Sequence, residues 1–327
     1  MEFWLPMIFA AVCGLALLMY VVLDGYDLGV GLLLPFADDD EKDRMIASIG
    51  PFWDANETWI VLGVGVLLIA FPAAHGIILT SLYLPATLML MGLVLRGIAF
   101  DFRVKAGDEQ KQRWNAIFSL GSLIAALCQG WMLGAYISGL GNSPLQLLFA
   151  LLTALSLPVL YLMLGSAWLL CKTAGTLPAK ARRWGRRGWL PLGCALGVIS
   201  LATPLVSADI AARWFTLPQF FLLLPIPLLA VACYSWTGLA LFGRVSCRPF
   251  TLFAALAGIC ISAATGLGYS LYPWIVPGQL LIVDAAAATE SLLFTLWGVL
   301  LTLPLIMAYT FFVYRIFSGT NLTQQYD

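Results

Sequence analysis

Two pairs of acidic residues have the types and spacing that could do chemistry in this chain. Asp24 and Asp27 form one pair, and Asp54 and Glu57 form the other. Residues three apart on a helix share a face, so each pair would present two carboxylates together. Both pairs border long apolar runs, where an ionisable group needs a partner or water and is a candidate for handling protons. We therefore take both pairs as candidate proton-handling groups.

Each pair also has a structural interpretation. The first pair could be the charged end of a helix, with the glycines at 25, 29 and 31 serving as a seam for close helix packing. The second pair could cap a helix, because carboxylates are favoured at helix N-termini. Trp53 and Trp59 could be interfacial aromatic residues. Both interpretations stay open for both pairs.

A third motif, with Arg96, Asp101 and Arg103, closes a later apolar run. Arg96 lies several residues inside that run, so its side chain must reach the interface or form an ion pair. If the three motifs reach the same depth, we predict that Arg96 pairs with Asp24, Asp27, Asp54 or Glu57. The convergence of these groups with Asp101 at one level is stronger evidence for a site than any single residue.

The histidine content limits the redox chemistry available to the chain. His75 is the only histidine, and a bis-histidine haem site needs two. The seven cysteines contain no C-x-x-C pair, and most lie in apolar runs. We therefore expect no metal site, no haem and no catalytic centre in this chain itself.

The elements that must position these residues follow from composition. Of 327 residues, 61% are hydrophobic and 10% are charged, whereas soluble domains carry roughly 25% charged residues. The mean hydropathy is +0.92. The formal net charge is zero, with 17 basic and 17 acidic residues, which excludes nucleic-acid binding as a main task. The chain is expected to be an all-α polytopic membrane protein.

Apolar runs between charged residues indicate nine transmembrane helices, since one crossing needs about 20 apolar residues. Two runs are long enough for two helices each, with turns expected at 71–76 and 138–144. Unbroken apolar runs exclude a strand-based barrel. The runs are 3–23, 58–95 (two), 114–171 (two), 188–208, 214–243, 249–283 and 291–314.

Basic residues predict the orientation of these helices. Fifteen of the 17 lysines and arginines fall in alternate loops or in the C-terminal tail, and only Arg96 and Arg213 do not. By the positive-inside rule, those loops and the C-terminus face the cytoplasm and the N-terminus faces outside. We further expect two four-helix bundles plus one extra helix. The expected divisions are a first bundle at 1–171 with the charged motifs, a basic cytoplasmic loop at 172–187, and a second bundle with the last helix at 188–327.

Three segments together resemble subunit II of the cytochrome bd quinol oxidases, in its shorter, cyanide-insensitive-oxidase-like type. They are Val22–Gly31 (VLDGYDLGVG), Ile49–Trp59 (IGPFWDANETW) and Leu95–Arg103 (LRGIAFDFR). The order and spacing of the segments match the family. Beyond this first third, the resemblance rests on length, nine spans and topology.

The resemblance implies a role in aerobic respiration in the bacterial inner membrane. A partner, subunit I, would carry two b-type haems, one haem d and the quinol site, and the pair would reduce oxygen to water with cytoplasmic protons. This chain would carry no haem, although a structural quinone and a small single-helix subunit are known in the family. Asp54 matches a family carboxylate implicated in proton transfer at the subunit interface. Asp24, Asp27 and Arg96 match further family positions without a settled role.

Two other functions fit parts of the pattern. Nine spans with glycine-broken helix ends and buried carboxylates would suit an ion-coupled secondary transporter, but paired broken segments in the two halves are missing. A purely structural scaffold for an oxidase, with no part in proton transfer, is the second alternative.

Overall fold

Helices of membrane-spanning length make up most of the chain. The computed structural model describes residues 3–317, and nine helical segments in that range are long and apolar enough to cross a membrane. This confirms the all-α polytopic fold with nine transmembrane helices. The long helices are α1 (Trp4–Leu33), α3 (Trp53–Ala70), α5 (Tyr83–Lys105), α6 (Asp108–Ile137), α7 (Pro144–Lys172), α8 (Leu177–Val206), α11 (Pro225–Leu241), α12 (Pro249–Leu271) and α14 (Thr289–Ile316).

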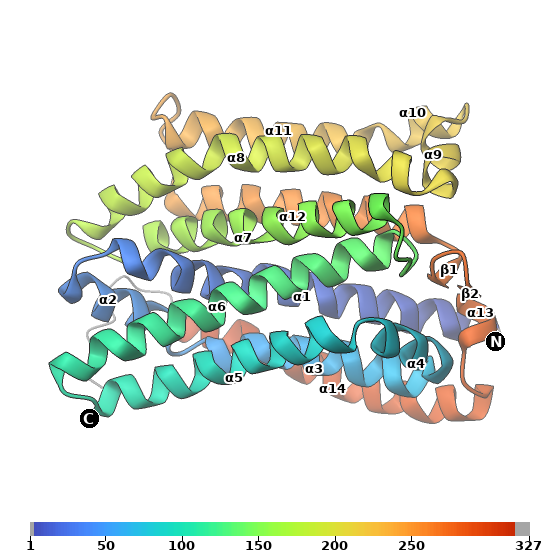
Figure 1. The fold of residues 1–327 in the computed structure, drawn as a ribbon, viewed down its shortest axis with the longest axis horizontal. Helices are drawn as coiled ribbons and strands as arrows, with labels where there is room; N and C mark the ends of the chain where they lie inside the picture. The colour runs from blue at the N-terminus through green and yellow to red at the C-terminus, as the bar shows by residue number, and fades with distance from the viewer. Residues whose placement is uncertain (1–2, 318–327) are drawn as a thin grey trace.

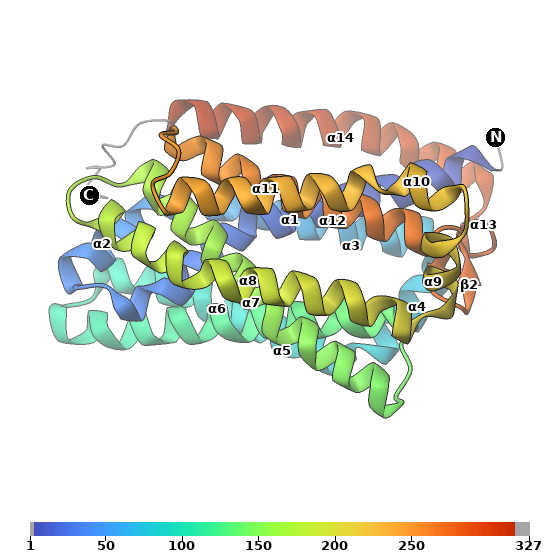
Figure 2. The same cartoon turned by 90° about the horizontal axis from the view of Figure 1, so that it is seen from above.

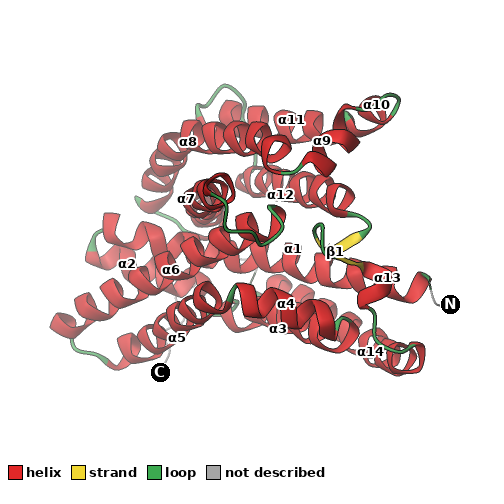
Figure 3. Cartoon of the chain, turned by 45° about the vertical axis from the view of Figure 1, so that its right-hand side comes forward, coloured by secondary structure: helices red, strands yellow, loops and turns green. Residues whose placement is uncertain are grey.

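Short elements join the long helices and add a small hairpin at one end (Figure 3). The two strands pair antiparallel, with Trp274 opposite Leu281. The short elements are η1 (Leu34–Phe36), α2 (Asp39–Ile49), α4 (Pro72–Ser81), α9 (Ala208–Phe215), α10 (Gln219–Leu223), β1 (Trp274–Val276), β2 (Leu280–Leu281) and α13 (Ile282–Ala285).

The long helices run side by side along one axis, with α1 near the centre (Figures 1 and 2). α1 packs against α7, α3 and α6, and also touches α12 and α14. In Figure 1, α8 and α11 form the outer layer on one side, and α3, α5 and α14 lie on the other. Charged side chains on α1 are therefore surrounded by protein.

Local sequence explains where several helices begin. Ser143 caps α7 in a reciprocal arrangement with Gln146, and Pro144 occupies the first helical turn. Proline also lies in the first turn of α4, α8, α11 and α12. Proline fits there because the first N–H groups of a helix have no partner within the helix.

The predicted division of the chain is wrong in two respects. Five of the nine spans lie before Thr173 and four after it, so 1–171 cannot be a four-helix bundle. The basic segment 172–187 is not a loop: only residues 173–176 separate α7 from α8, and the basic residues from Lys180 to Arg187 lie on α8. Lysine and arginine are good helix formers, so positive charge does not by itself end a helix. The last part of the predicted second unit, 318–327, lies outside the described residues.

Other boundaries also differ from expectation. The predicted turn at 71–76 is a break at Phe71 followed by the helix α4, which begins at Pro72. The run 249–283 contains one span that ends at Leu271, followed by the hairpin and α13. The turn expected at 138–144 is confirmed, since α6 ends at Ile137 and α7 begins at Pro144.

Two glycines set the distance between α1 and α7. A Cβ added at Gly29 would overlap the Tyr161 carbonyl group and lie 2.9 Å from the Gly165 nitrogen. A Cβ added at Gly165 would in turn overlap the backbone of Gly29 and Val30. The two backbones are thus in direct contact, an approach that only small residues allow.

Polar contacts join α2, which lies between α1 and α3 in the sequence, to the start of α8. Glu41 on α2 is buried and accepts hydrogen bonds from Lys180 (2.6 Å) and Thr176 (2.9 Å). Burial raises the pKa of Glu41, but the hydrogen bonds from Lys180, the Asp38 N–H and Thr176 outweigh it, leaving the pKa below its ordinary value of 4.5. The charged form of Glu41 therefore stabilises the folded state.

We predict that Gly29→Ala destabilises the protein by about 1–3 kcal/mol or more, because the added methyl group overlaps fixed backbone atoms. The measurement is thermal unfolding of the purified protein, together with its yield. Gly65→Ala is the matched control, since Gly65 lies inside α3 and a Cβ there meets nothing within 4 Å. Equal stability of the two variants would contradict the close-contact explanation.

We also predict that Glu41→Gln reduces the acid sensitivity of the protein's stability. The lowered pKa of Glu41 means that its contribution is complete above about pH 4.5 and disappears as the pH falls through the folded-state pKa. The parent should lose more stability on acidification than the variant, as measured by unfolding at a series of pH values. Asp40→Asn, at an exposed site on the same helix, should keep the acid sensitivity of the parent.

Candidate functional site

The first carboxylate pair lies inside the protein. Each residue from Val22 to Gly31 is buried, and the side chains of Asp24 and Asp27 have no solvent exposure. The helix continues past both residues to Leu33 because the apolar run continues with it. Asp24 and Asp27 therefore do not form an interfacial charged end, and their charges must be balanced by protein groups.

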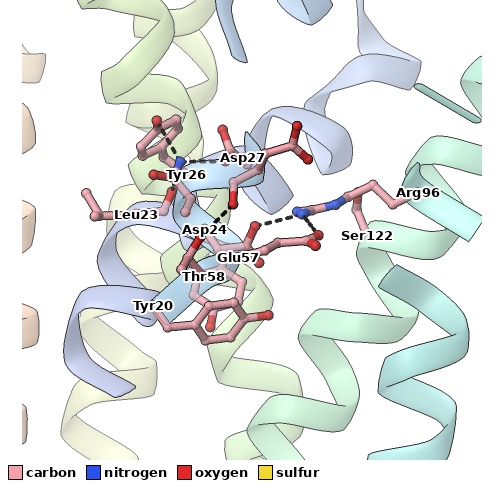
Figure 4. A network of polar contacts seen from close by, with 12 residues as sticks. Tyr20, Leu23, Asp24, Tyr26, Asp27, Glu57, Thr58, Arg96 and Ser122 are labelled. Carbon is pink, nitrogen blue, oxygen red and sulfur yellow. Dashed lines mark hydrogen bonds and ion pairs between the residues drawn. The ribbon is translucent and has the colours of Figure 1, made fainter. Parts of the chain in front are cut away.

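Arg96 supplies the positive charge. It is 1% exposed, and its Nη2 lies 2.8 Å from Oδ1 of Asp24. The same nitrogen donates to Oε1 of Glu57, whose side chain is 30% exposed. Figure 4 shows the guanidinium reaching from α5 toward both acids. The prediction that Arg96 pairs with one of the four carboxylates is confirmed, with two of them.

Asp27 belongs to a second set of contacts, centred on Asn56. The Asn56 Nδ2 donates to Oδ2 of Asp27 at 2.7 Å, and lies 2.9 Å from the Tyr26 hydroxyl. The Tyr314 hydroxyl, on α14, donates to Oδ1 of Asn56 at 3.1 Å and lies 2.6 Å from the Tyr26 hydroxyl. α1, α3 and α14 thus meet in one hydrogen-bonded group of neutral side chains around a carboxyl group.

A third polar group lies about one helical turn before Asp24 on α1. The Gln129 amide, on α6, donates to the Tyr20 hydroxyl at 2.7 Å. Its carbonyl accepts from the Tyr161 hydroxyl, on α7, at 2.6 Å. These three side chains are buried. Six helices therefore contribute to the buried polar region: α1, α3, α5, α6, α7 and α14.

Several buried polar atoms have no hydrogen-bond partner among the described residues. Oδ1 of Asp27 and the Nε and Nη1 of Arg96 are in this state. Buried polar groups are normally hydrogen-bonded to protein or ordered water. These atoms belong to the residues of the buried cluster, so the cluster is suited to hold water or an extra proton.

Asp54 and Asp101 lie outside this buried cluster. Both are exposed, Asp54 in the first turn of α3 and Asp101 on α5. The Asp54 side chain makes no hydrogen bond or ion pair within the described residues, and α3 has no side-chain cap hydrogen bond. Hydrogen-bonded capping by Asp54 is therefore not seen. Asp54 is one turn before Glu57 on the same face, at the accessible edge of the cluster.

Arg103 and His75 lie outside the buried cluster. Arg103 is buried and donates to Asn115 at 2.5 Å and to Asp43 on α2. His75 lies on α4, at the opposite end of the bundle from α2. Among the described side chains, which leave out 108 and 109, no group of three or more histidine, cysteine, aspartate or glutamate residues is placed to hold a metal ion.

Sequence reasoning missed the neutral members of the cluster. Asn56 lies inside a motif quoted above but carries no charge, and the search was for ionisable groups. Gln129 had a usable signal, because a glutamine within an apolar run needs a hydrogen-bond partner. Tyr20, Tyr26, Tyr161 and Tyr314 gave none, since tyrosine is ordinary in membrane helices.

Comparisons with known proteins agree on one family. The family model for cytochrome bd terminal oxidase subunit II matches residues 5–317. The chain is 26% identical to the cytochrome bd ubiquinol oxidase subunit 2 of Bacillus subtilis, over 91% of each chain. It is 25% identical to the cytochrome bd-I ubiquinol oxidase subunit 2 of Escherichia coli K12, over 92% of this chain and 91% of the relative.

A solved structure has the same fold. The bd oxidase from Geobacillus thermodenitrificans aligns with a TM-score of 0.77 and 18% identity, covering 96% of this chain and 98% of the other. The family match extends over nearly all of the described helices, including the three motifs that build the buried cluster. The chain therefore belongs to the cytochrome bd terminal oxidase subunit II family and is a membrane subunit of an oxidoreductase complex.

Proposed function

We propose that this chain is the haem-free subunit of a quinol:oxygen oxidoreductase and supports a haem-bearing subunit I. The single histidine supports this proposal, because a bis-histidine haem site cannot be built from one. The residues present therefore do not fit a bis-histidine haem, and no step of the reaction is assigned to a haem in this chain. Two b-type haems, haem d and the quinol site would belong to the partner. A structural quinone and a small single-helix subunit stay predictions of the family resemblance.

We further propose that the cluster provides part of a proton path from the cytoplasm. The observation that carries this is the shared nitrogen of Arg96, which joins the partly exposed Glu57 to the buried Asp24. Asp54 stands one turn outside Glu57 and is exposed. Carboxyl groups that pass from exposed to buried in steps of one helical turn, with unpartnered polar atoms between them, are suited to relay protons through water.

The orientation of the chain follows from the same proposal. The end of the bundle that carries α2, the α5–α6 turn and the start of α8 also carries most basic residues (Figure 1). By the positive-inside rule, this end faces the cytoplasm of a bacterial inner membrane, with the N-terminus outside and the C-terminus inside. The Asp54–Glu57 edge would then lie on the side from which protons are taken up.

The transporter alternative has no observation in its favour. Family membership points to an oxidase subunit rather than to a carrier. The purely structural alternative differs from the proton-path proposal in one respect only, which is whether Asp54 and Glu57 exchange protons during turnover.

We predict that Asp54→Asn leaves an assembled, haem-replete complex whose quinol-driven oxygen reduction falls by about ten-fold or more. Asparagine retains the size and polarity of aspartate but cannot exchange a proton, and loss of a proton-transfer group typically costs about 10²–10⁴-fold. Asp54→Glu should recover part of the activity. The measurements are oxygen consumption and haem absorbance per complex.

The matched control is Glu290→Gln. Glu290 is an exposed carboxylate in the first turn of α14 and lies at the other end of the bundle. It shares the helix-end position of Asp54 but not its proximity to the cluster, so activity should be unchanged. Parent-level oxygen consumption by a haem-replete Asp54→Asn complex would leave only the structural role.

We predict, as a separate test, that the chain purified without subunit I shows no haem bands in a reduced-minus-oxidised spectrum. The complex with both subunits should show them. Haem bands in this chain alone, at a stoichiometry near one or more, would contradict the haem-free assignment. Quinol oxidase activity from this chain alone would also do so.

A further inference from the structure

The buried cluster has an imbalance of charge. Asp24, Asp27 and Glu57 could carry three negative charges, and Arg96 carries one positive charge. Arginine does not lose its proton in proteins, so the fully ionised cluster would have a net charge of −2. A net charge of that size among fully or largely buried groups is strongly disfavoured, and binding of protons is the usual remedy.

The three acids differ in how their charge is compensated. Asp24 has Arg96 at 2.8 Å, and Glu57 has both Arg96 and access to solvent. Asp27 has neither: it forms no ion pair among the described residues, it is fully buried, and its only donor is the Asn56 amide. An amide donor serves a neutral carboxyl group as well as a charged one.

Within the described part of the chain, Arg96 is the only cation near Asp27, and it makes no ion pair with Asp27. The remaining ionisable groups facing this region are the tyrosines at 20 and 26 on α1, Tyr161 on α7 and Tyr314 on α14, with Cys260 on α12 beside Tyr161. α6 contributes only the neutral Ser122 and Gln129. Lys172 on α7 donates to the Phe317 carbonyl and lies over the rings of Phe52 and Trp168.

We propose that Asp27 is a neutral carboxylic acid in the resting protein and holds a proton within the cluster. The proton would lie on Oδ1, since Oδ2 already accepts from Asn56. Oδ1 of Asp27 is a buried atom without a hydrogen-bond partner among the described residues. Asp24 lies one helical turn earlier on the same face, so it can accept from the Asp27 O–H, directly or through one water. The unpartnered Oδ1 of Asp27 is thereby explained.

The protonation state of Asp27 does not depend on the proposed proton path. Only the transfer of its proton during turnover rests on that proposal. If the O–H bond of Asp27 breaks and the proton moves to Asp24, the charge of the cluster is unchanged. When that proton leaves Asp24 for the interior, the cluster gains one negative charge, and uptake of one replacement proton through Glu57 restores the resting state. Asp27 would thus act as a proton store between the accessible edge of the cluster and the interior, and the assignment of charge stands whether or not the path is used.

The test is infrared spectroscopy of the intact two-subunit complex at neutral pH. A neutral carboxylic acid gives a carbonyl-stretch band separate from those of carboxylates and amides, and the band shifts in heavy water. We expect such a band in the parent and its loss in Asp27→Asn. Asparagine copies the shape and neutrality of the proposed acid, so this variant should assemble with normal haem content and thermal stability.

Asp24→Asn and Glu57→Gln provide the contrast. Both residues are proposed to be carboxylates paired with Arg96, so neither substitution should remove the band attributed to Asp27 in a complex that assembles. Asp24→Asn should also reduce assembly, because Arg96 loses its buried partner. If it does not assemble, Glu57→Gln and Asp27→Asn still decide the assignment.

Two results would overturn the proposal. One is a band that survives in Asp27→Asn but disappears in Asp24→Asn or Glu57→Gln, which would place the proton on another acid. The other is a parent spectrum in which no carboxylic-acid band is lost on substitution of Asp27 by Asn. Because this is an equilibrium measurement without turnover, it is independent of the oxygen-consumption result for Asp54→Asn.

Discussion

The buried guanidinium of Arg96 is the constraint on which the arrangement of α1, α3 and α5 depends. Its charge is permanent, so its partners on α1 and α3 must be held in place at all times. Removing one partner of a buried ion pair typically costs about 3–5 kcal/mol, a large share of the stability of most proteins. The depth of α5 relative to α1 and α3 is therefore set by one side chain rather than by apolar packing, which in a membrane tolerates helix sliding.

Close packing and charge burial depend on each other in this fold. Gly29 and Gly165 bring α1 and α7 into backbone contact, and Gly31 faces Phe118 and Ser122 on α6. Without these small residues, α1 could not be enclosed on all sides, and its carboxylates would face lipid or bulk water. The pattern of glycines after Asp24 is thus both the packing seam and the condition for an enclosed, polar interior. The packing seam and the buried carboxylates of this motif belong to a single arrangement.

The sequence predicted the class of fold, the number of spans and the pairing of Arg96, because each rests on a rule that needs no knowledge of neighbours. Apolar length indicates a span, and an arginine within a span needs an acid. The rest depends on long-range packing. Asn56 is a ligand of Asp27 only because α3 packs on α1, and Tyr314 joins them only because α14 returns to the same place. The division of the chain failed for a related reason: positive charge was taken to end a helix, whereas α8 simply carries it beyond the apolar region.

The place of Tyr314 bears on how the fold is completed. α14 is the last of the described helices in chain order, it presents most of its surface outward, and the Phe317 carbonyl just after it accepts from Lys172. Until α14 is inserted, the Tyr26 hydroxyl and the Asn56 carbonyl lack their third companion, although every charged member of the cluster is already present. The charged members of the cluster lie within the first hundred residues, yet the hydrogen-bonded group around Asp27 is completed by a residue more than 250 positions later, so its full set of contacts forms only when both ends of the described fold have come together.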